Sequence, residues 1–230
     1  FHVAAEDVLD LPPATHQRID CELSPAGQKT YTQMSWQFIA AVESGEVTAA
    51  NALVRLLRLS QITSGWVRAD DQSYDEHVDD SKEKTLLDLL EDIPRDQSVV
   101  VFGRFLSDLD CARRVAVQLS RPHNELSGRR KEIGGAGRML PQPGQILATQ
   151  MQAGGLGVDL SQAHYAVFFS VGYSLGDYLQ CIARLHRVEQ KHPVHYYHLV
   201  CSGTIDEQIY RALDQRRDVI QSILEEIKDG

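Results

Sequence analysis

The sequence lacks the features that mark several large classes of protein. It has no run of about 18 apolar residues, and its first residues do not show the basic and then apolar layout of a secretory signal. Four cysteines occur singly in apolar stretches, without a Cys-x-x-Cys pair, which disfavours a disulfide framework and a zinc ribbon. We therefore expect reduced core thiols, no membrane partner and a cytoplasmic location, in a chain of prokaryotic or phage origin.

The chain has no overall excess of basic residues, because its net charge is -9 over 230 residues. The acidic residues are concentrated in residues 70–96, where eleven acids and three bases give -8. Residues 121–138 are locally basic and glycine-rich, which predicts a loop. Two interpretations of this loop stay open: a phosphate-binding patch in which Arg129, Arg130, Lys131 and Arg138 are free, or a solubilising loop.

Hydrophobic patterning predicts an α/β fold. Short apolar runs typical of buried strands occupy residues 98–102, 145–149, 165–170 and 194–200. Helical apolar spacing lies between them, and strands that alternate with helices predict a mostly parallel sheet with helices on both faces. In such sheets ligands bind beyond the carboxyl ends of the strands.

We divide the chain into three parts. Residues 1–66 hold a strand that enters the lobe, expected at residues 19–23, and a helical segment; residues 67–97 form an acidic linker and helix; residues 98–230 form the main lobe. The last helix is expected to begin after Thr204, with Glu207 completing a Thr-x-x-Glu capping box and apolar positions continuing through residue 227.

Two features are compatible with phosphate binding, although each taken singly is more typical of a structural role. Gly154, Gly155 and Gly157 follow a predicted strand, where glycines allow close backbone approach to a phosphate, although a simple turn is the alternative. Arg184 and Arg187 share a face of the helix expected over residues 174–188, where a solvated face is the alternative. We expect both guanidinium groups to project into open space from the ligand-binding edge of the sheet.

The spacing of a histidine series argues against a metal site. His192, His195, His198 and Cys201 recur every three residues. Since a strand alternates its side chains, His195 and His198 are expected on opposite faces of the sheet, whereas metal ligands must converge on one side.

Several segments resemble, in order, the second RecA-like lobe of the Swi/Snf-type family of superfamily-two ATPases. The two most specific are ATQMQAGGLGVDLSQAHYAVFF, which is similar to motif V, and QCIARLHRVEQ, which is similar to motif VI. The remaining matches are LPPATHQRIDCELSPAGQKTY, LRLSQITSG, SVVVFGRFLSDLD (motif IV), ELSG and VHYYHLVCSGTIDEQI. The resemblance implies a RecA-like lobe of a motor that translocates on double-stranded DNA.

The resemblance also implies roles for particular residues. Arg187 would be the arginine finger on ATP, with Arg184 beside it as the second catalytic residue. Gln180, Gly157 and Asp159 would lie on the nucleotide side. The residues implied in contacts with the DNA backbone are Arg104, Ser127, Gly128, Thr149, Gln150, Gly154 and Gly155.

The implied cofactor is ATP with Mg²⁺, bound mainly by an N-terminal RecA-like lobe that would be this chain's partner. The sequence has no G-x-x-x-x-G-K-[ST] loop, and Asp75-Glu76-His77 lies in a polar stretch unlike a Walker B strand. We therefore expect the isolated chain to be inactive and to be an excised lobe or one half of a split enzyme. The alternative function is a non-catalytic module that binds DNA or protein.

Overall fold

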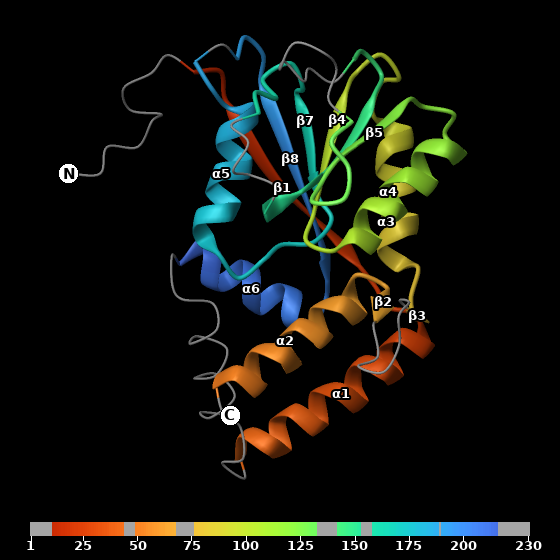
Figure 1. Cartoon of the computed structure of the whole chain (residues 1–230), viewed down its shortest axis with the longest axis vertical. Helices are drawn as coiled ribbons and strands as arrows, with labels where there is room; N and C mark the ends of the chain where they lie inside the picture. Colours follow the sequence, from red (N-terminus) through yellow and green to blue (C-terminus); the bar gives the residue numbers. More distant parts are fainter. Residues whose placement is uncertain are drawn as a thin grey trace, which may run out of the picture.

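A six-stranded parallel sheet forms the centre of the protein (Figure 1). The computed structural model describes residues 11–43, 49–67, 76–132, 142–152, 158–188 and 190–215. The strands lie in the spatial order β1-β8-β7-β4-β6-β5. Their bounds are β1 Ala14–Cys21, β4 Val99–Gly103, β5 His123–Leu126, β6 Ile146–Gln150, β7 Tyr165–Phe168 and β8 Val194–Cys201.

Helices cover both faces of the sheet. The helices are α1 Pro25–Glu43, α2 Ala49–Thr63, α3 Ser81–Asp92, α4 Leu106–Gln118, α5 Leu175–Leu185 and α6 Ile205–Asp214. One hydrophobic core joins α3 and α4 to side chains such as Val101 and Val167, and a second joins α2, α5 and α6 to side chains such as Phe102 and Phe168. Alternation along each strand separates the two cores. The predicted α/β fold, with a mostly parallel sheet covered on both faces, is confirmed.

The first strand begins five residues before the expected position. β1 pairs with β8 from Ala14 to Cys21, at the edge of the sheet. Residues 15–18 are polar and exposed, so no apolar alternation marks them in the sequence. The edge position explains the error, because only one side of β1 is hydrogen-bonded to a neighbour and its outer residues meet solvent.

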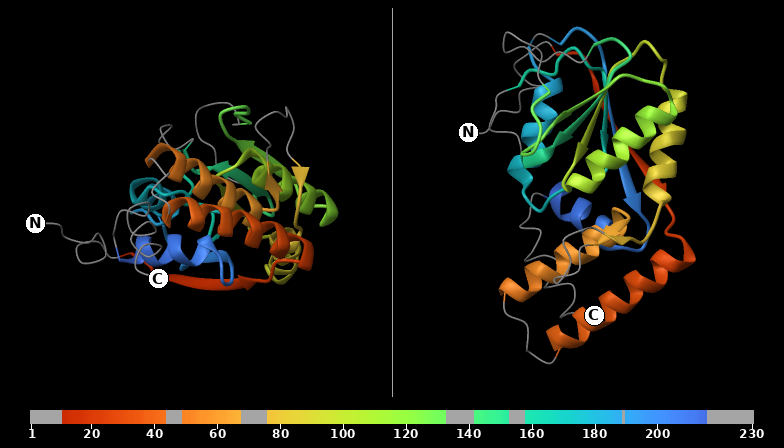
Figure 2. Two further views of the ribbon diagram at one scale, coloured as in Figure 1. Left: turned by 90° about the horizontal axis from the view of Figure 1, so that it is seen from below. Right: turned by 45° about the vertical axis from the view of Figure 1, so that its right-hand side comes forward.

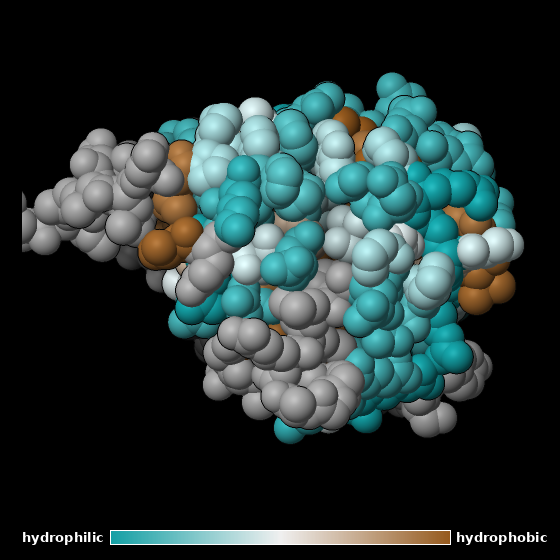
Figure 3. Space-filling model, turned by 90° about the horizontal axis from the view of Figure 1, so that it is seen from above, coloured by the Kyte–Doolittle hydropathy of each residue, from teal (hydrophilic) through white to brown (hydrophobic). Residues whose placement is uncertain are grey.

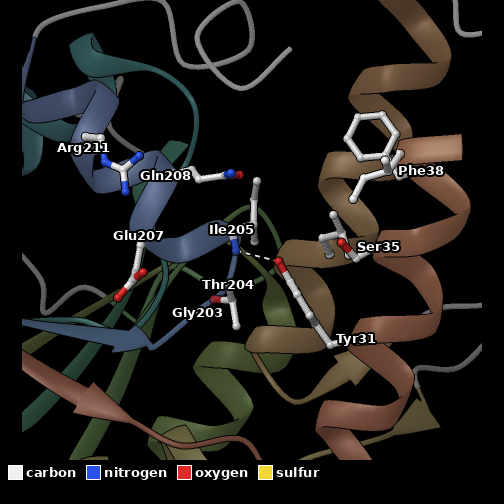
Figure 4. A pocket seen from close by; sticks show the side chains of 11 residues that line it. Tyr31, Ser35, Phe38, Gly203, Thr204, Ile205, Glu207, Gln208 and Arg211 are labelled. Carbon is white, nitrogen blue, oxygen red and sulfur yellow. Dashed lines mark hydrogen bonds between the residues drawn. The ribbon is translucent and has the colours of Figure 1, made fainter. Parts of the chain in front are cut away.

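Helices α1 and α2 lie across the carboxyl edge of the sheet, side by side in the view from below (Figure 2). The Ile205 N–H, at the start of α6, donates a 2.6 Å hydrogen bond to the Tyr31 hydroxyl on α1 (Figure 4). On α2, the Ser60 hydroxyl is 3.0 Å from the Tyr173 hydroxyl. These bonds attach the helical pair to the loops that follow β7 and β8.

A short hairpin precedes α3. β2 (Trp66–Val67) pairs antiparallel with β3 (Glu76–His77), which places Glu76 and His77 in a two-stranded sheet outside the main one. α3 follows, and its buried side chains are Lys82, Leu86 and Leu90. The segment expected to be an acidic linker and helix thus contributes buried residues to the core.

The predicted N-cap of the last helix is confirmed, but its capping box is not formed. The Thr204 hydroxyl accepts a 3.2 Å hydrogen bond from the Asp206 N–H. The Glu207 carboxylate does not reach back to Thr204 and instead pairs with Arg18 of β1. The exposed edge strand offers Glu207 a cation, which the local sequence pattern cannot show. The apolar positions expected to continue this helix from residue 216 lie outside the described residues.

A buried ion pair joins α3 to α6. The Lys82 ammonium is 2.7 Å from the Asp206 carboxylate and donates a 3.0 Å hydrogen bond to the Phe169 carbonyl. Asp206 also accepts hydrogen bonds from the Thr63 hydroxyl at 2.8 Å and the Cys201 N–H at 3.1 Å. Burial opposes the charge on Lys82, but the neighbouring Asp206 outweighs it and raises the pKa of Lys82.

None of the helices in the described part of the chain is both long enough and apolar enough to cross a membrane.

We predict that Lys82→Met lowers the free energy of unfolding by about 3 to 5 kcal/mol, because it leaves the buried Asp206 carboxylate without its cation. Urea denaturation of the purified chain measures the change. Lys84→Met is the matched control on the same helix, since Lys84 forms only an exposed pair with Asp80. Equal losses of stability for the two substitutions would contradict the stabilising role of the buried Lys82–Asp206 pair. In the double variant Lys82→Met/Asp206→Asn, part of the loss should be recovered.

Candidate functional site

Helix α5 carries Gln180 and Arg184, and leads to Arg187, away from the carboxyl edge of the sheet. It begins at that edge, where the Ser174 hydroxyl caps it by accepting from the Asp177 N–H, and it runs back over the sheet. Its last turn therefore lies at the amino edge, where His186 is 2.8 Å from the Pro12 carbonyl that precedes β1. The prediction that both arginines project from the carboxyl edge is wrong, because a helix that connects parallel strands must return antiparallel to them.

The two arginines have different surroundings. Arg187, just after α5, is exposed, whereas Arg184 is only 6% exposed. Within the described part of the chain, neither terminal nitrogen of Arg184 has a hydrogen-bond partner. The expectation of open space holds for Arg187 and is wrong for Arg184, which packs under the end of its helix. Buried unpaired donors are costly, so an acceptor placed beside the Arg184 guanidinium would be stabilising. Gln180, one turn earlier, is exposed.

The structure brings Leu160, in the segment compared with motif V, against α5. The Leu160 N–H donates a 3.0 Å hydrogen bond to the Arg184 carbonyl. Asp159, next to it, is partly buried, and its carboxylate accepts from the Ser161 N–H at 2.9 Å. Asp159 and Arg184 are thus neighbours, as their shared assignment to a nucleotide site requires. Gly154, Gly155 and Gly157 lie outside the described residues.

The amino edge, which includes this corner, is mainly hydrophilic in the view from above, with small hydrophobic spots (Figure 3). Such a surface suits charged or polar ligands better than an apolar one.

A second group of predicted residues meets at the carboxyl edge. The Gln150 side chain, at the end of β6, accepts from the Gly128 N–H at 3.3 Å and donates to the Arg104 carbonyl at 3.4 Å. Arg104, Gly128 and Gln150, three of the residues expected to contact DNA, therefore form one cluster at the ends of three adjacent strands, β4, β5 and β6. Gly128 is exposed, and Arg104 and Gln150 are partly buried.

The Arg104 guanidinium lies against aromatic rings, 4.1 Å from the centroid of Tyr173 and 5.3 Å from that of Phe105. Asp108 fixes its backbone by accepting from the Arg104 N–H at 3.0 Å. A cavity of about 150 Å³ lies beside Arg104 and Tyr173. Sequence reasoning missed both Tyr173 and Asp108. Asp108 could have been found as an acid in the first turn of a helix, but Tyr173 carried no signal.

Two of the predicted DNA contacts are wrong for their side chains. Thr149 is fully buried in β6. Ser127 is 1% exposed, and its hydroxyl donates to the Glu125 carboxylate at 2.6 Å. β6 is buried from Ile146 to Thr149 because helices cover both faces of the sheet, and Ser127 lies directly after the buried end of β5.

Two arginines of the predicted basic patch, Arg129 and Arg130, lie beside acids. Arg129 is held by two carboxylates, with Glu125 at 2.8 Å and Asp110 at 2.5 Å. Arg130 lies 3.8 Å from Glu132. Neutralisation by neighbouring acids contradicts the prediction that Arg129 is available to phosphates, and Arg138 lies outside the described residues.

The histidine series is divided between the two faces of β8, as predicted. His195 stacks on Tyr165, and His198 stacks on Phe168 in the opposite core. Burial, with the nearby His16, lowers the pKa of His198 to about 3, so this ring is neutral. Among the described residues, no group of three or more His, Cys, Asp or Glu side chains is arranged to hold a metal ion.

One further cavity, of about 230 Å³, lies between α1 and the start of α6 (Figure 4). Its lining includes Tyr31, Phe38 and Thr204. It contains none of the residues assigned to nucleotide or DNA.

Sequence comparison finds distant relatives among helicases and DNA repair proteins. No family model matches the chain. It is 26% identical over 224 residues to an uncharacterised ATP-dependent helicase of Mycoplasma genitalium, covering 94% of this chain and 21% of that protein. It is also 26% identical over 241 residues to the DNA repair and recombination protein RDH54 of Saccharomyces cerevisiae, covering 93% and 24%. The chain therefore spans about a fifth to a quarter of the length of these relatives.

Structural comparison supports the same fold. The C-terminal part of the Fun30 ATPase domain superposes with a TM-score of 0.66 at 18% identity, over 94% of this chain and 99% of that one. The Sulfolobus solfataricus SWI2/SNF2 ATPase core, solved with double-stranded DNA, gives a TM-score of 0.69 at 20% identity, over 93% and 47%. The second match involves only about half of that core.

We predict that Arg129→Gln lowers the free energy of unfolding at pH 7 by about 1 to 3 kcal/mol, because it removes the cation beside the buried Glu125 carboxylate. Burial opposes ionisation of Glu125, but the hydrogen bonds from Arg129 and Ser127 outweigh it and lower the pKa of Glu125 below its ordinary 4.5. This contribution is therefore present above pH 4.5 and is lost as the pH falls through the lowered pKa.

Urea denaturation between pH 7 and pH 3 tests this prediction. The difference between Arg129→Gln and the unsubstituted chain should shrink in acid. Arg113→Gln, at an exposed position on α4, is the control and should change the stability little at any pH. A difference that stays constant down to pH 3 would contradict the role of Glu125.

Proposed function

Because this chain has the fold of the C-terminal lobe of SWI2/SNF2-type ATPases and is homologous to ATP-dependent helicases, we propose that it is the second motor lobe of an ATP-dependent translocase on double-stranded DNA. The observation that carries the proposal is the pair of arginines at the end of α5, one exposed and one buried with unpaired donors, beside Asp159. A scaffold gains nothing from burying an unpaired guanidinium.

The proposed chemistry is transfer of the γ-phosphoryl group of ATP to water. ATP with Mg²⁺ would be held mainly by the N-terminal lobe, which supplies the phosphate-binding loop and the metal-binding acids. Arg187 would reach the γ-phosphate, where its forked donors stabilise the charge that develops on the phosphoryl oxygens. Arg184 would offer its two unpaired terminal nitrogens, and Gln180 and Asp159 would complete the nucleotide side.

The position of α5 supports one direction of approach for the partner lobe. Arg187 and Val188 are exposed at the amino edge, and Val188 is 69% exposed. The N-terminal lobe would therefore cover this corner and leave the cluster of Arg104, Gly128 and Gln150 at the opposite edge for DNA. Closure of the lobes around ATP and their release after hydrolysis would move one lobe along the strand.

DNA contact would use the phosphate backbone. Arg104 supplies a positive charge, and the exposed Gly128 brings backbone close to the surface of the cluster. Such contacts do not read bases, which suits a motor that moves along any sequence.

A second candidate function is a non-catalytic module that retains the lobe fold to hold DNA or protein. The chain contains neither a Walker A loop nor a Walker B strand, which keeps this candidate open. The response of ATP hydrolysis to Arg187 separates the two candidates.

We predict that Arg187→Ala lowers the DNA-stimulated kcat by about 10³- to 10⁵-fold in a protein that joins this chain to its N-terminal lobe. A phosphate-release assay measures the rate. Arg113→Ala, on α4, is the control and should leave the rate unchanged. The chain without the first lobe should show no turnover. An ATPase rate that Arg187→Ala leaves unchanged would favour the binding module.

We predict that Arg104→Gln weakens binding of double-stranded DNA similarly for all sequences and reduces the slope of log K against log salt concentration by about one, since one phosphate contact is lost. Fluorescence anisotropy between low and physiological salt measures both quantities. Arg113→Gln should not change the slope. An unchanged slope for Arg104→Gln would remove this cluster from the DNA path.

A further inference from the structure

Gln190 is a buried glutamine with no role assigned so far. The residue is 4% exposed. Its side-chain N–H groups point at three carbonyl oxygens, with distances of 2.9 Å to Ser161, 3.3 Å to Ala163 and 3.2 Å to Leu185. Its side-chain oxygen accepts from the N–H groups of Lys191 and His192, each at 3.0 Å. Both donors and both lone pairs of the amide are therefore used.

These bonds connect three separate segments at the corner that holds the arginines. Ser161 and Ala163 belong to the segment that follows Asp159, Leu185 ends α5, and Lys191 lies on the approach to β8. The bond from the Leu160 N–H to the Arg184 carbonyl joins the first two segments independently. Gln190 thus fixes the end of α5 against the segment that carries Asp159.

The backbone of Gln190 closes the turn that carries Arg187. Its N–H donates a 2.9 Å hydrogen bond to the Arg187 carbonyl, while its side chain holds the Leu185 carbonyl two residues earlier. In the described part of the chain, the exposed Arg187 side chain makes no hydrogen bond or ion pair. The place from which its side chain extends is therefore set through its backbone, which Gln190 holds at the carbonyls of Leu185 and Arg187.

We propose that Gln190 is a positioning residue that orients Arg187 toward the γ-phosphate of ATP. The proposal rests on the proposed function and adds a residue that does not touch the nucleotide. A small displacement of a catalytic group lowers the rate strongly, by about 10²-fold for about 1 Å. Gln190→Met keeps the length and unbranched shape of the side chain and removes all five polar contacts.

The first measurement needs no catalysis. Hydrogen exchange of the isolated chain should show amides of residues 185–192 exchanging about tenfold faster or more in Gln190→Met, while the amides of α4 keep their protection. Gln145→Met is the matched control, because Gln145 is another buried glutamine, 6% exposed, that accepts from the Gln142 N–H far from α5. Unchanged exchange in residues 185–192 would overturn the proposal.

The second measurement uses the chain joined to its N-terminal lobe. Gln190→Met should lower kcat by about 10²-fold and change the KM for ATP by less than about threefold, whereas Gln145→Met should retain full activity. The double variant Gln190→Met/Arg187→Ala should be no slower than Arg187→Ala alone, because both act through the same guanidinium. If Gln190→Met does not fold, Gln190→Asn takes its place, because it keeps the amide on a shorter side chain. Its single and double variants are then compared with Arg187→Ala in the same way.

The outcomes separate the two proposals. A double variant that is much slower than Arg187→Ala would show that Gln190 acts on stability in general and would overturn the positioning role. Full activity of a folded Gln190→Met, with Arg187→Ala inactive, would overturn the positioning role alone. Full activity of Arg187→Ala would overturn the proposed function and the positioning role together.

Discussion

The buried ion pair between Lys82 and Asp206 is the interaction on which the arrangement of the lobe depends. Asp206 lies at the start of α6, and its carboxylate is bound by Lys82 of α3, Thr63 of α2 and the backbone of β8. Helices from both faces of the sheet therefore meet at one charged group at the carboxyl edge. Removing two charges from water costs free energy, and the attraction between them offsets this cost only when their geometry is correct. The buried pair therefore favours one packing of the helices over others.

The lobe separates its two proposed tasks by the length of a strand. Parallel strands place Arg104, Gly128 and Gln150 at the carboxyl edge, and the returning helix α5 places Arg184 and Arg187 at the amino edge. The segment between β6 and β7 begins after Gln150 and includes Leu160, whose N–H donates to the Arg184 carbonyl, before β7 starts at Tyr165. A single connection thus runs from the DNA cluster to the nucleotide corner, and a change at either end has a covalent path to the other.

Several polar side chains within the lobe hold backbone groups in place. Asp108 fixes the loop of Arg104, Ser127 holds the turn after β5, and Gln190 holds the turn of Arg187. Each satisfies buried backbone groups that no regular element pairs, which is the usual requirement on buried polar groups.

The sequence by itself determined the α/β class, the strands with apolar runs and the cap at Thr204, because each follows from local periodicity or capping chemistry, and its resemblance to a known family placed Gln150 and Arg104 in one set of expected contacts. It did not determine the start of β1, whose polar outer residues give no periodic signal, or the burial of Arg184, Thr149 and Ser127. The tertiary structure alone decided that Glu207 pairs with Arg18, that Asp110 and Glu125 neutralise Arg129, and that the arginines lie at the amino edge. These outcomes depend on which charges and helices that are far apart in the sequence come into contact. Only the packing of the folded chain sets the distances between them.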